Sequence, residues 1–386
     1  MYLTRALEPT LARYLSSFPV VGIAGPRQSG KSTMLVQTLG KKYEYVTFDD
    51  FAALQLFQDD PDRFLRLHPA PVIFDEIHRA PELFVNLKLL VDKDRRSKGR
   101  FVLTGSSQFA VMKRVSESLA GRIGLLTLFP FQRSETPAAR RNEAIWKGTY
   151  PELIVEEYAH REEWYSSYLD TYLTRDVRDM GGVGDLRDFR RCLVLLAGRT
   201  GQLLNISELA RDLGVAVNTV KRWISVMESS FVVYLLKPLF KNIGRRLVKS
   251  PKVYFIDPGM VSFLTGIHTE SMFEDGPLAG PLFENYVVSE LLKRETHNGR
   301  RPELSFVRTS NGVEVDVVID RGASREFIEI KNTSTFRPDL LKGLRSLKGK
   351  ADTGLLLYRG KSMDYEEGLR ILNFSDYLLG DDGEVN

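Results

Sequence analysis

The stretch FPVVGIAGPRQSGKSTML, residues 18–35, holds Gly25 and Gly30 with four residues between them, and Lys31 and Ser32 directly after. An apolar run, VVGIA, precedes this pattern, and a helical pattern follows it. The spacing is that of a phosphate-binding loop between a strand and a helix, in which backbone N–H groups hold phosphate oxygens. Its lysine reaches the terminal phosphates, and the Ser32 hydroxyl suits Mg²⁺ as a metal ligand. The residues expected to contact a nucleotide are Gly25, Pro26, Arg27, Gln28, Ser29, Gly30, Lys31, Ser32 and Thr33.

Two further apolar runs end in polar residues that suit the same chemistry. In APVIFDEIHRAP, the run VIF is followed by Asp75 and Glu76. Asp75 can hold Mg²⁺ while its neighbour Glu76 polarises the attacking water. In RFVLTGSSQF, the apolar run ends in Thr104, Ser106 and Ser107, where a hydroxyl, that of Ser106 above all, can touch the terminal phosphate or orient the attacking water. Such residues also serve as caps without any chemistry. Alternating strands and helices with polar strand ends predict a parallel sheet that carries the nucleotide at its carboxyl edge, over residues 1–135.

These motifs resemble those of the AAA-type P-loop ATPases of bacteria and archaea. The resemblance rests on PRQSGKST, FDEI, LTGS and SLAGR, which occur in this order. It implies ATP and Mg²⁺ as cofactors and ATP hydrolysis as the activity. It also implies that an arginine near the terminal phosphate stabilises the developing charge, and Arg122 of SLAGR is the candidate. The chain departs from the family at His78, where glutamine is usual, and we expect a structural role for this histidine.

Residues 136–255 are expected to form a helical linker followed by a winged helix. NISELARDLGVAVNTVKRWISVMESS contains two amphipathic helical patterns with the separation of a helix-turn-helix, and a basic β-hairpin is expected in residues 234–257. The second helix would expose Asn218, Thr219, Lys221 and Arg222. The basic residues expected at the tip of the hairpin are Lys237, Lys241, Arg245, Arg246 and Lys249. Such modules bind DNA in many proteins and are internal packing domains in others, so both interpretations stay open.

The third part, residues 256–386, contains GVEVDVVIDRGASREFIEIKNT, residues 312–333, which predicts two strands joined by a turn. Because successive side chains of a strand point to opposite faces, Asp316 of the first strand would share a face with Glu329 and Lys331 of the second. One interpretation is a solvated sheet face with a cross-strand ion pair.

Upstream, GPLAGPLFENYVVSELLKR predicts an amphipathic helix with Glu284 near its beginning. The order of Glu on a helix, Asp on a strand and Glu-x-Lys on the next strand resembles the PD-(D/E)XK nuclease fold. The resemblance implies that Asp316 and Glu329 bind Mg²⁺ or Mn²⁺. Glu284 would then support the metal, and Lys331 would position the water that attacks a phosphodiester. The chain departs from the motif at Val315, which takes the place of the proline.

The composition limits which classes of protein remain to be considered. The 386 residues exceed the size of a single core, so two or three domains are expected. Lys and Arg number 54 against 50 Asp and Glu, so the formal charge of +4 does not by itself indicate a polyanion-binding protein. The single cysteine, Cys192, excludes an internal disulfide framework and a cysteine zinc site. No apolar run reaches the length of a membrane span, so we expect a cytoplasmic protein without a membrane partner.

The sequence therefore predicts an α/β fold in three parts: a parallel-sheet P-loop ATPase domain, a helical and winged-helix middle, and an α/β PD-(D/E)XK nuclease-like C-terminal domain. Within the last part we expect a buried strand in residues 350–360 and an amphipathic helix in residues 366–380.

The leading functional hypothesis is an Mg²⁺-dependent ATPase that acts on DNA and cuts it at the C-terminal site. The alternative is a nucleotide-switched DNA-binding or regulatory ATPase whose nuclease-like domain is inactive. A phosphotransfer enzyme for a small molecule would share the loop but would not account for the C-terminal carboxylates. An arginine acting on another copy of the chain would require a homo-oligomer.

Overall fold

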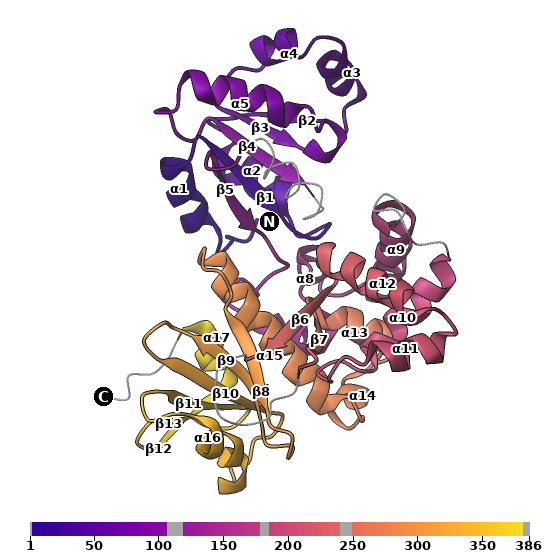
Figure 1. Cartoon of the computed structure of the whole chain (residues 1–386), viewed down its shortest axis with the longest axis vertical. Helices are drawn as coiled ribbons and strands as arrows, with labels where there is room; N and C mark the ends of the chain where they lie inside the picture. Colours follow the sequence, from indigo (N-terminus) through magenta and orange to yellow (C-terminus); the bar gives the residue numbers. More distant parts are fainter. Residues whose placement is uncertain (1, 106–118, 178–184, 240–248, 381–386) are drawn as a thin grey trace.

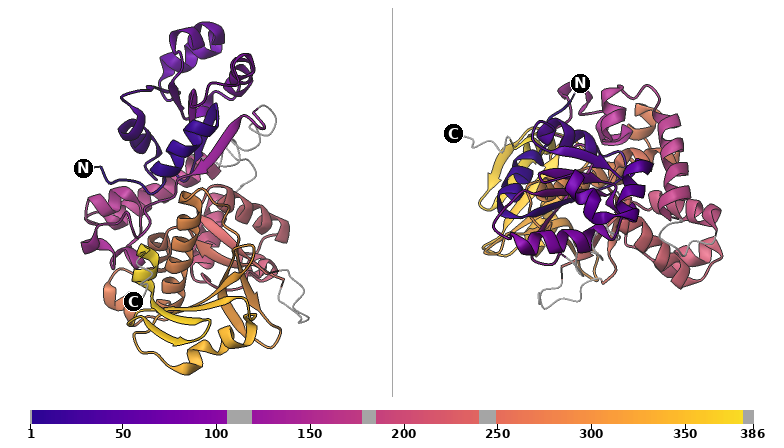
Figure 2. Two further views of the ribbon diagram at one scale, coloured as in Figure 1. Left: turned by 90° about the vertical axis from the view of Figure 1, so that its left-hand side faces the viewer. Right: turned by 90° about the horizontal axis from the view of Figure 1, so that it is seen from above.

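The computed structural model describes residues 2–105, 119–177, 185–239 and 249–380 of the chain. Three parts follow one another along the sequence, with the N-terminal part at one end of the molecule and the C-terminal part at the other (Figure 1). The left view of Figure 2 shows how the N-terminal part rises above the rest. Within the described residues, no helix has both the length and the apolar content needed to cross a membrane.

In the described N-terminal part, five parallel strands form a sheet with the order β2-β3-β4-β1-β5. The strands are β1 (Val20–Ala24), β2 (Glu44–Thr47), β3 (Val72–Asp75), β4 (Phe101–Gly105) and β5 (Ile123–Thr127). The helices are α1 (Glu8–Ser17), α2 (Lys31–Leu39), α3 (Phe51–Asp59), α4 (Pro61–Leu67) and α5 (Leu83–Lys93). Both sheet faces are covered, since Val20 packs with α3, α4 and α5 whereas Val21 packs with α1 and α2. The predicted parallel sheet is thereby confirmed.

The middle part is mainly helical. Its α-helices are α7 (Ala144–Lys147), α8 (Pro151–Val155), α9 (Arg161–Thr171), α10 (Leu186–Ala197), α11 (Ile206–Leu213), α12 (Val217–Ser229), α13 (Pro258–Thr265) and α14 (Glu270–Glu274). The Asn205 side chain caps α11 by accepting a hydrogen bond from Glu208 N at 3.2 Å. Gly214 ends that helix in the left-handed conformation, with φ of 71°. The two helices expected from the sequence and the turn between them are therefore confirmed.

The described strands of the C-terminal part belong to a mixed sheet of eight strands, in the order β12-β13-β11-β10-β9-β8-β6-β7. They are β6 (Val233–Pro238), β7 (Lys252–Phe255), β8 (Leu304–Arg308), β9 (Glu314–Asp320), β10 (Arg325–Lys331), β11 (Thr353–Tyr358), β12 (Met363–Glu366) and β13 (Leu369–Asn373). The pair expected in residues 312–333 is confirmed, because β9 and β10 run antiparallel with Val317 opposite Ile328. The helix α16 (Lys342–Leu347) lies between β10 and β11 in the sequence.

The helix expected over residues 366–380 is wrong in its first half. Gly368 makes a turn with φ of 73°, and β13 then pairs in parallel with β11. Leu369 and Ile371 are both buried, which is the alternation of a strand. Only α17 (Phe374–Leu379) is helical in this segment.

The strands β6 and β7 join the middle part to the C-terminal sheet. β6 pairs in parallel with β8, with Lys237 opposite Ser305, and β7 pairs antiparallel with β6. The domain boundary expected at residue 255 therefore falls inside one continuous sheet. The next helix, α13, packs against α7 and α10 of the middle part. Sequence periodicity does not reveal this arrangement, because the paired strands are far apart along the chain.

The helix α15 (Ala279–His297) lies at the centre of the molecule (Figure 1). It contacts β5 of the N-terminal part, α7 and α13 of the middle part, and β7, β10 and α17 of the C-terminal sheet. The sequence predicts an amphipathic helix here, but α15 also buries polar residues such as Asn285, Lys293 and His297 completely. Buried polar groups need partners, and the other parts of the chain supply them.

Candidate functional site

The phosphate-binding loop connects the end of β1 to the start of α2. A Cβ on Gly25 would lie 2.1 Å from the backbone oxygen of Leu128, so only glycine fits there. Gly30 is left-handed, with φ of 88°, directly before α2. The Lys31 ammonium donates hydrogen bonds to the carbonyl oxygens of Gly25 at 3.0 Å and Pro26 at 2.8 Å. A lysine held across a loop at a helix N-terminus is a suitable anion site.

Asp75 ends β3 and collects hydroxyl groups at the carboxyl edge of the sheet. Ser32 Oγ donates a hydrogen bond to Asp75 Oδ2 at 2.8 Å, and the Tyr45 and Thr104 hydroxyls donate to the same carboxylate. Adjacent hydroxyl and carboxylate oxygens are ligands that Mg²⁺ prefers, so these residues fit this metal. The sequence predicted Ser32 and Asp75 but missed Tyr45, because no motif marks its position on β2. Burial, together with Asp75, raises the pKa of Tyr45, so its hydroxyl keeps its proton.

Glu76 follows Asp75 and lines a pocket beside the phosphate-binding loop. Its backbone is left-handed, with φ of 53°, a conformation that is costly for a residue other than glycine and that clusters at active sites. Its Oε2 atom is buried and makes no hydrogen bond within the described residues. His78 Nδ1 lies 3.0 Å from this oxygen but without hydrogen-bond geometry. A carboxylate oxygen that is available beside a phosphate loop can orient an attacking water.

The pocket has a volume of about 500 Å³ and two walls. The N-terminal wall consists of Arg27, Gln28, Gly30, Lys31, Ser32, Thr33 and Glu76. The second wall comes from α8 and α9 and consists of Glu152, Trp164, Ser167, Tyr168 and Thr171. Trp164 Nε1 donates a hydrogen bond to Glu152 at 2.9 Å, and its ring stacks on Tyr168 with the ring centres 5.2 Å apart. No motif in the middle part marked this second wall.

The structure does not bring Arg122 to this pocket. Arg122 directly precedes β5 at the amino edge of the sheet, where its carbonyl oxygen accepts a hydrogen bond from Val20 N. Its guanidinium pairs with Asp92 of α5, at 2.8 Å between Nε and Oδ1 and 3.1 Å between Nη2 and Oδ2. The loop lies at the opposite edge, so Arg122 does not reach the pocket of its own chain. Ser106, the other residue expected near the terminal phosphate, lies outside the described residues.

Arg5 joins the loop to the segment that follows β5. Its Nη1 donates a hydrogen bond to Ser29 O of the loop at 2.7 Å, and its Nη2 donates one to Phe129 O at 2.7 Å. Its Nε donates to Glu135 Oε1 at 3.0 Å, in an ion pair whose two side chains are each 2% exposed. Sequence reasoning missed Arg5, because its partners come from two segments that are far from it along the chain.

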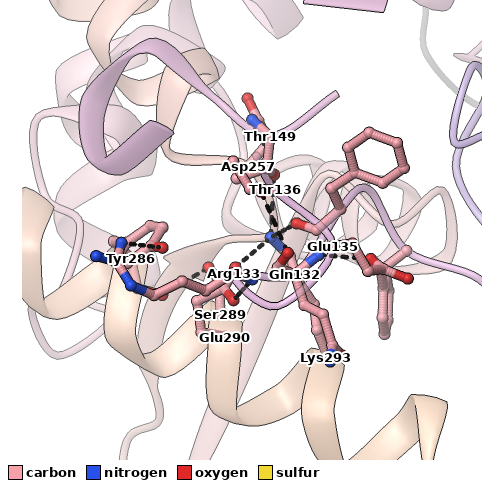
Figure 3. A network of polar contacts seen from close by, with 12 residues as sticks. Gln132, Arg133, Glu135, Thr136, Thr149, Asp257, Tyr286, Ser289, Glu290 and Lys293 are labelled. Atoms are coloured by element: carbon pink, nitrogen blue, oxygen red, sulfur yellow. Dashed lines mark hydrogen bonds and ion pairs between the residues drawn. The ribbon is translucent and has the colours of Figure 1, made fainter. Parts of the chain in front are cut away.

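The segment after β5 is tied to α15 by a buried polar network (Figure 3). Glu290 accepts hydrogen bonds from Arg133 N at 2.5 Å and from Lys293 at 2.9 Å. Lys293 also donates to a backbone oxygen of the segment at 3.1 Å. His297 Nε2 accepts a hydrogen bond from a backbone N–H of the segment at 3.1 Å, and burial lowers the pKa of His297 to about 4, so its ring is neutral. The loop, this segment and α15 therefore form one connected unit.

A second cluster of charged side chains lies where α15 meets the C-terminal sheet. The residues of this cluster that the sequence predicted are Glu284 of α15, Asp316 of β9, and Glu329 and Lys331 of β10. Sequence reasoning missed Lys252 of β7, whose ammonium lies 3.1 Å from Glu284 Oε1 and 3.6 Å from Asp316 Oδ1. Lys252 also pairs with Glu314 of β9. It was missed because it reaches the cluster only through the pairing of β7 with β6 and of β6 with β8.

Lys331 lies on the other side of the cluster. Its Nζ is 2.6 Å from Glu329 Oε1 and 3.6 Å from Asp316 Oδ2. Burial and the neighbouring Asp316 raise the pKa of Glu329 to about 8, and the same two causes raise the pKa of Glu284. Asp316 and Glu329 are buried, which is at odds with a solvated sheet face.

The carboxylates do not fit Mg²⁺ or Mn²⁺ in this arrangement. Among the described residues, no group of three or more Asp, Glu, His or Cys side chains is arranged to hold a metal ion. Instead, the ammonium groups of Lys252 and Lys331 contact the carboxylate oxygens.

The surface of α12 carries the residues expected to contact DNA. Asn218, Lys221 and Arg222 are exposed and Thr219 is half-buried. Of the basic residues expected at the tip of the hairpin, Lys237 and Lys249 are described and exposed. The other three, Lys241, Arg245 and Arg246, lie outside the described residues.

Comparison with protein families finds three matches along the chain. A model described as an AAA domain matches residues 17–136. Two models described as domains of unknown function, DUF8612 and DUF4143, match residues 139–271 and 279–377.

Relatives with similar sequences cover most of the chain. An uncharacterized protein of Mycobacterium tuberculosis is 32% identical over 339 residues, which are 87% of this chain and 75% of the relative. An uncharacterized protein of Haemophilus influenzae is 23% identical over 310 residues, which are 70% of this chain and 74% of the relative. Among solved structures, a Walker-type ATPase of Pyrococcus abyssi has a TM-score of 0.45 and 13% identity, covering 67% of this chain and 94% of that one.

Proposed function

We propose Mg²⁺-dependent ATP hydrolysis as an activity of this chain, which belongs to the same family as the uncharacterized mycobacterial protein and matches an AAA domain over residues 17–136. The observation that carries the proposal is that Ser32 and Glu76 line the pocket of the phosphate-binding loop while Ser32 donates a hydrogen bond to Asp75. Phosphate release from ATP by the purified chain, with and without Mg²⁺, tests it. No release above background in the presence of Mg²⁺ would contradict the proposal.

Each side chain of the pocket has a defined task within this proposal. Lys31 exchanges its loop carbonyl partners for the terminal phosphates. Ser32 and Asp75 hold Mg²⁺, which when bound neutralises charge on the phosphate oxygens. Glu76 orients the attacking water and accepts its proton through the buried Oε2. Tyr45 fixes the Asp75 carboxylate by donating a hydrogen bond to it.

Arg122 is proposed to act on the pocket of a neighbouring copy in a homo-oligomer. The family resemblance implies an arginine at the terminal phosphate, and Arg122 lies at the amino edge of the sheet, away from the pocket of its own chain. This position supports a role on the pocket of another copy. The guanidinium would exchange Asp92 for that phosphate.

A mixing experiment tests the neighbouring-copy role of Arg122. We expect Arg122→Ala and Lys31→Ala each to lose ATP turnover alone, because one lacks the arginine and the other lacks a working pocket. An equimolar mixture is expected to recover part of the turnover, measured as phosphate release, because mixed oligomers contain an intact pocket beside an intact Arg122. The control is Arg122→Ala mixed with the double variant Lys31→Ala, Arg122→Ala, which should recover nothing. Full turnover by Arg122→Ala alone would exclude this role.

DNA is proposed as a partner of the middle part. The elements α10, α11, α12 and the antiparallel pair β6–β7 follow the order of a winged helix, and the exposed Lys221 and Arg222 on α12 support contact with phosphates.

Removal of both charges is expected to weaken DNA binding. The double variant Lys221→Ala, Arg222→Ala should bind a DNA duplex at least about tenfold more weakly at low salt and lower the salt dependence of log K by about 2, because each lost phosphate contact removes about one released counterion. Fluorescence anisotropy at several salt concentrations measures both quantities. Arg190→Ala, Arg191→Ala on α10 is the matched control and should leave binding unchanged. Equal weakening in the two double variants would point to nonspecific charge attraction instead of an α12 surface.

The C-terminal part is proposed to be a PD-(D/E)XK-like centre that acts on DNA. The gathering of Glu284, Asp316, Glu329 and Lys331 in one cluster, in which Asp316 and Glu329 are buried, supports this interpretation. A regulatory ATPase with an inactive nuclease-like domain is the second candidate, and the Lys252 ammonium among the carboxylates favours it.

Labelled linear, branched and single-stranded DNA separates the two candidates. Wild type and Asp316→Ala are incubated with each DNA, with Mg²⁺ or Mn²⁺, and with or without ATP. Cutting that disappears in Asp316→Ala would favour the nuclease. No cutting by the wild type, despite DNA binding, would favour the regulatory ATPase.

A further inference from the structure

Lys252 is enclosed by the carboxylates of the C-terminal cluster. Its side chain is 3% exposed, and its ammonium contacts Glu284 at 3.1 Å, Asp316 at 3.6 Å and also Glu314. These three carboxylates come from α15 and β9, whereas Lys252 comes from β7. The three carboxylates therefore already surround a cation, which the chain itself supplies.

The fourth carboxylate of the cluster, that of Glu329, is an independent indication of a ligand at this site. Glu329 is 8% exposed, and its Oε2 atom has no hydrogen-bond partner within the described residues. Its Oε1 atom pairs with Lys331, which also lies 3.6 Å from Asp316. A buried carboxylate oxygen without a partner is costly unless a ligand satisfies it.

We propose that the Lys252 ammonium is a built-in counter-cation that occupies the metal position of the C-terminal cluster and competes with divalent metal ions for its carboxylates. The inference rests on the proposed PD-(D/E)XK-like function of this part and explains what keeps that site from binding a metal ion. An ammonium tethered to β7 acts at a fixed high local concentration, so a metal ion binds only when it displaces the lysine. Removal of the ammonium without loss of side-chain volume should therefore raise the affinity for the metal.

Lys252→Met tests the competition, because methionine keeps the unbranched apolar chain and removes the charge. We expect the dissociation constant of Mn²⁺ to fall by at least about tenfold in Lys252→Met relative to the wild type, because the carboxylates lose their internal cation. The loss of the paramagnetic resonance signal of free Mn²⁺ measures this constant in nucleotide-free protein. Lys252→Arg keeps a cation in place and should show no gain. The gain should disappear in Lys252→Met, Asp316→Asn, which excludes Mn²⁺ bound at the nucleotide loop.

The possible outcomes separate this inference from the function on which it rests. Mn²⁺ binding by the wild type that Asp316→Asn abolishes, without tighter binding in Lys252→Met, overturns the role of Lys252 and leaves the metal centre standing. Mn²⁺ binding by none of the variants overturns both. If Lys252→Met unfolds readily, thermal melting replaces the binding measurement. A rise in Tm on addition of Mn²⁺ that is larger than in the wild type and absent in the Asp316→Asn background supports the inference, and an equal or smaller rise overturns it.

Discussion

ATP turnover by Lys31→Ala is expected to fall at least about a hundredfold, because the charge that holds the terminal phosphates is lost. Nucleotide affinity should fall as well, since the ammonium crosses the loop in direct contact with the Gly25 and Pro26 carbonyl oxygens. Phosphate release measures the first effect, and titration with a fluorescent ATP analogue measures the second. Lys41→Ala, an exposed lysine just beyond the end of α2, is the matched control and should change neither quantity.

Glu76→Gln separates chemistry from binding at the same pocket. Glutamine keeps the size of the side chain but cannot accept the proton of the attacking water, so turnover should fall by about 10²–10⁴-fold while the nucleotide still binds. Loss of binding together with turnover would show that Glu76 holds the strained turn after β3 in place and is not a base. Wild-type turnover in both Lys31→Ala and Glu76→Gln would remove the site assignment altogether.

Arg5→Met is expected to lower the free energy of unfolding by about 3–5 kcal/mol, because it leaves a carboxylate buried without its cation. The lost contacts are those to Glu135, to Ser29 of the loop and to Phe129 after β5. Urea unfolding followed by tryptophan fluorescence measures the change. Arg345→Met removes a similar two-point pair with Glu366 from the surface, where water solvates both charges, and should have little effect.

The same Arg5→Met variant links stability to the pocket. The carbonyl oxygen of Ser29 in the phosphate-binding loop loses the hydrogen bond that Arg5 donates to it. The affinity for ATP should therefore weaken even under conditions in which the variant is folded. A stability loss no greater than that of Arg345→Met would mean that hydrogen bonds from backbone N–H groups are enough to stabilise the buried carboxylate of Glu135.

The nucleotide site could be predicted from the sequence because its parts are local. The loop between β1 and α2 is one contiguous motif, and Asp75 ends an apolar strand whose burial is visible in the sequence. Tyr45 could not be predicted, since it meets Asp75 only because β2 is the neighbour of β3 in the sheet. The wall from α9 was missed for the same reason, because a helical aromatic pattern does not show which part of the chain faces it.

The C-terminal cluster shows the same limit. The period of two in β9 and β10 was enough to predict that Asp316, Glu329 and Lys331 gather on one face. No local pattern predicts the position of Lys252, because that position depends on the strand order β8-β6-β7 in the sheet. The strand β13 was mistaken for a helix because Leu369 and Leu372 also have helical spacing. The turn at Gly368 and the pairing of this segment with β11 make it a strand.

The shared sheet has a consequence for how this chain can be divided. The gap between the two matched domains of unknown function, at residues 272–278, looks like a natural place to cut, but β6 lies before it and β8 after it. A fragment that starts at residue 279 would expose the backbone donors and acceptors of β8 that Lys237 and Pro238 now cover. Unprotected strand edges recruit other chains, so we expect such a fragment to aggregate. The two domains should therefore remain soluble only when they are produced as one polypeptide.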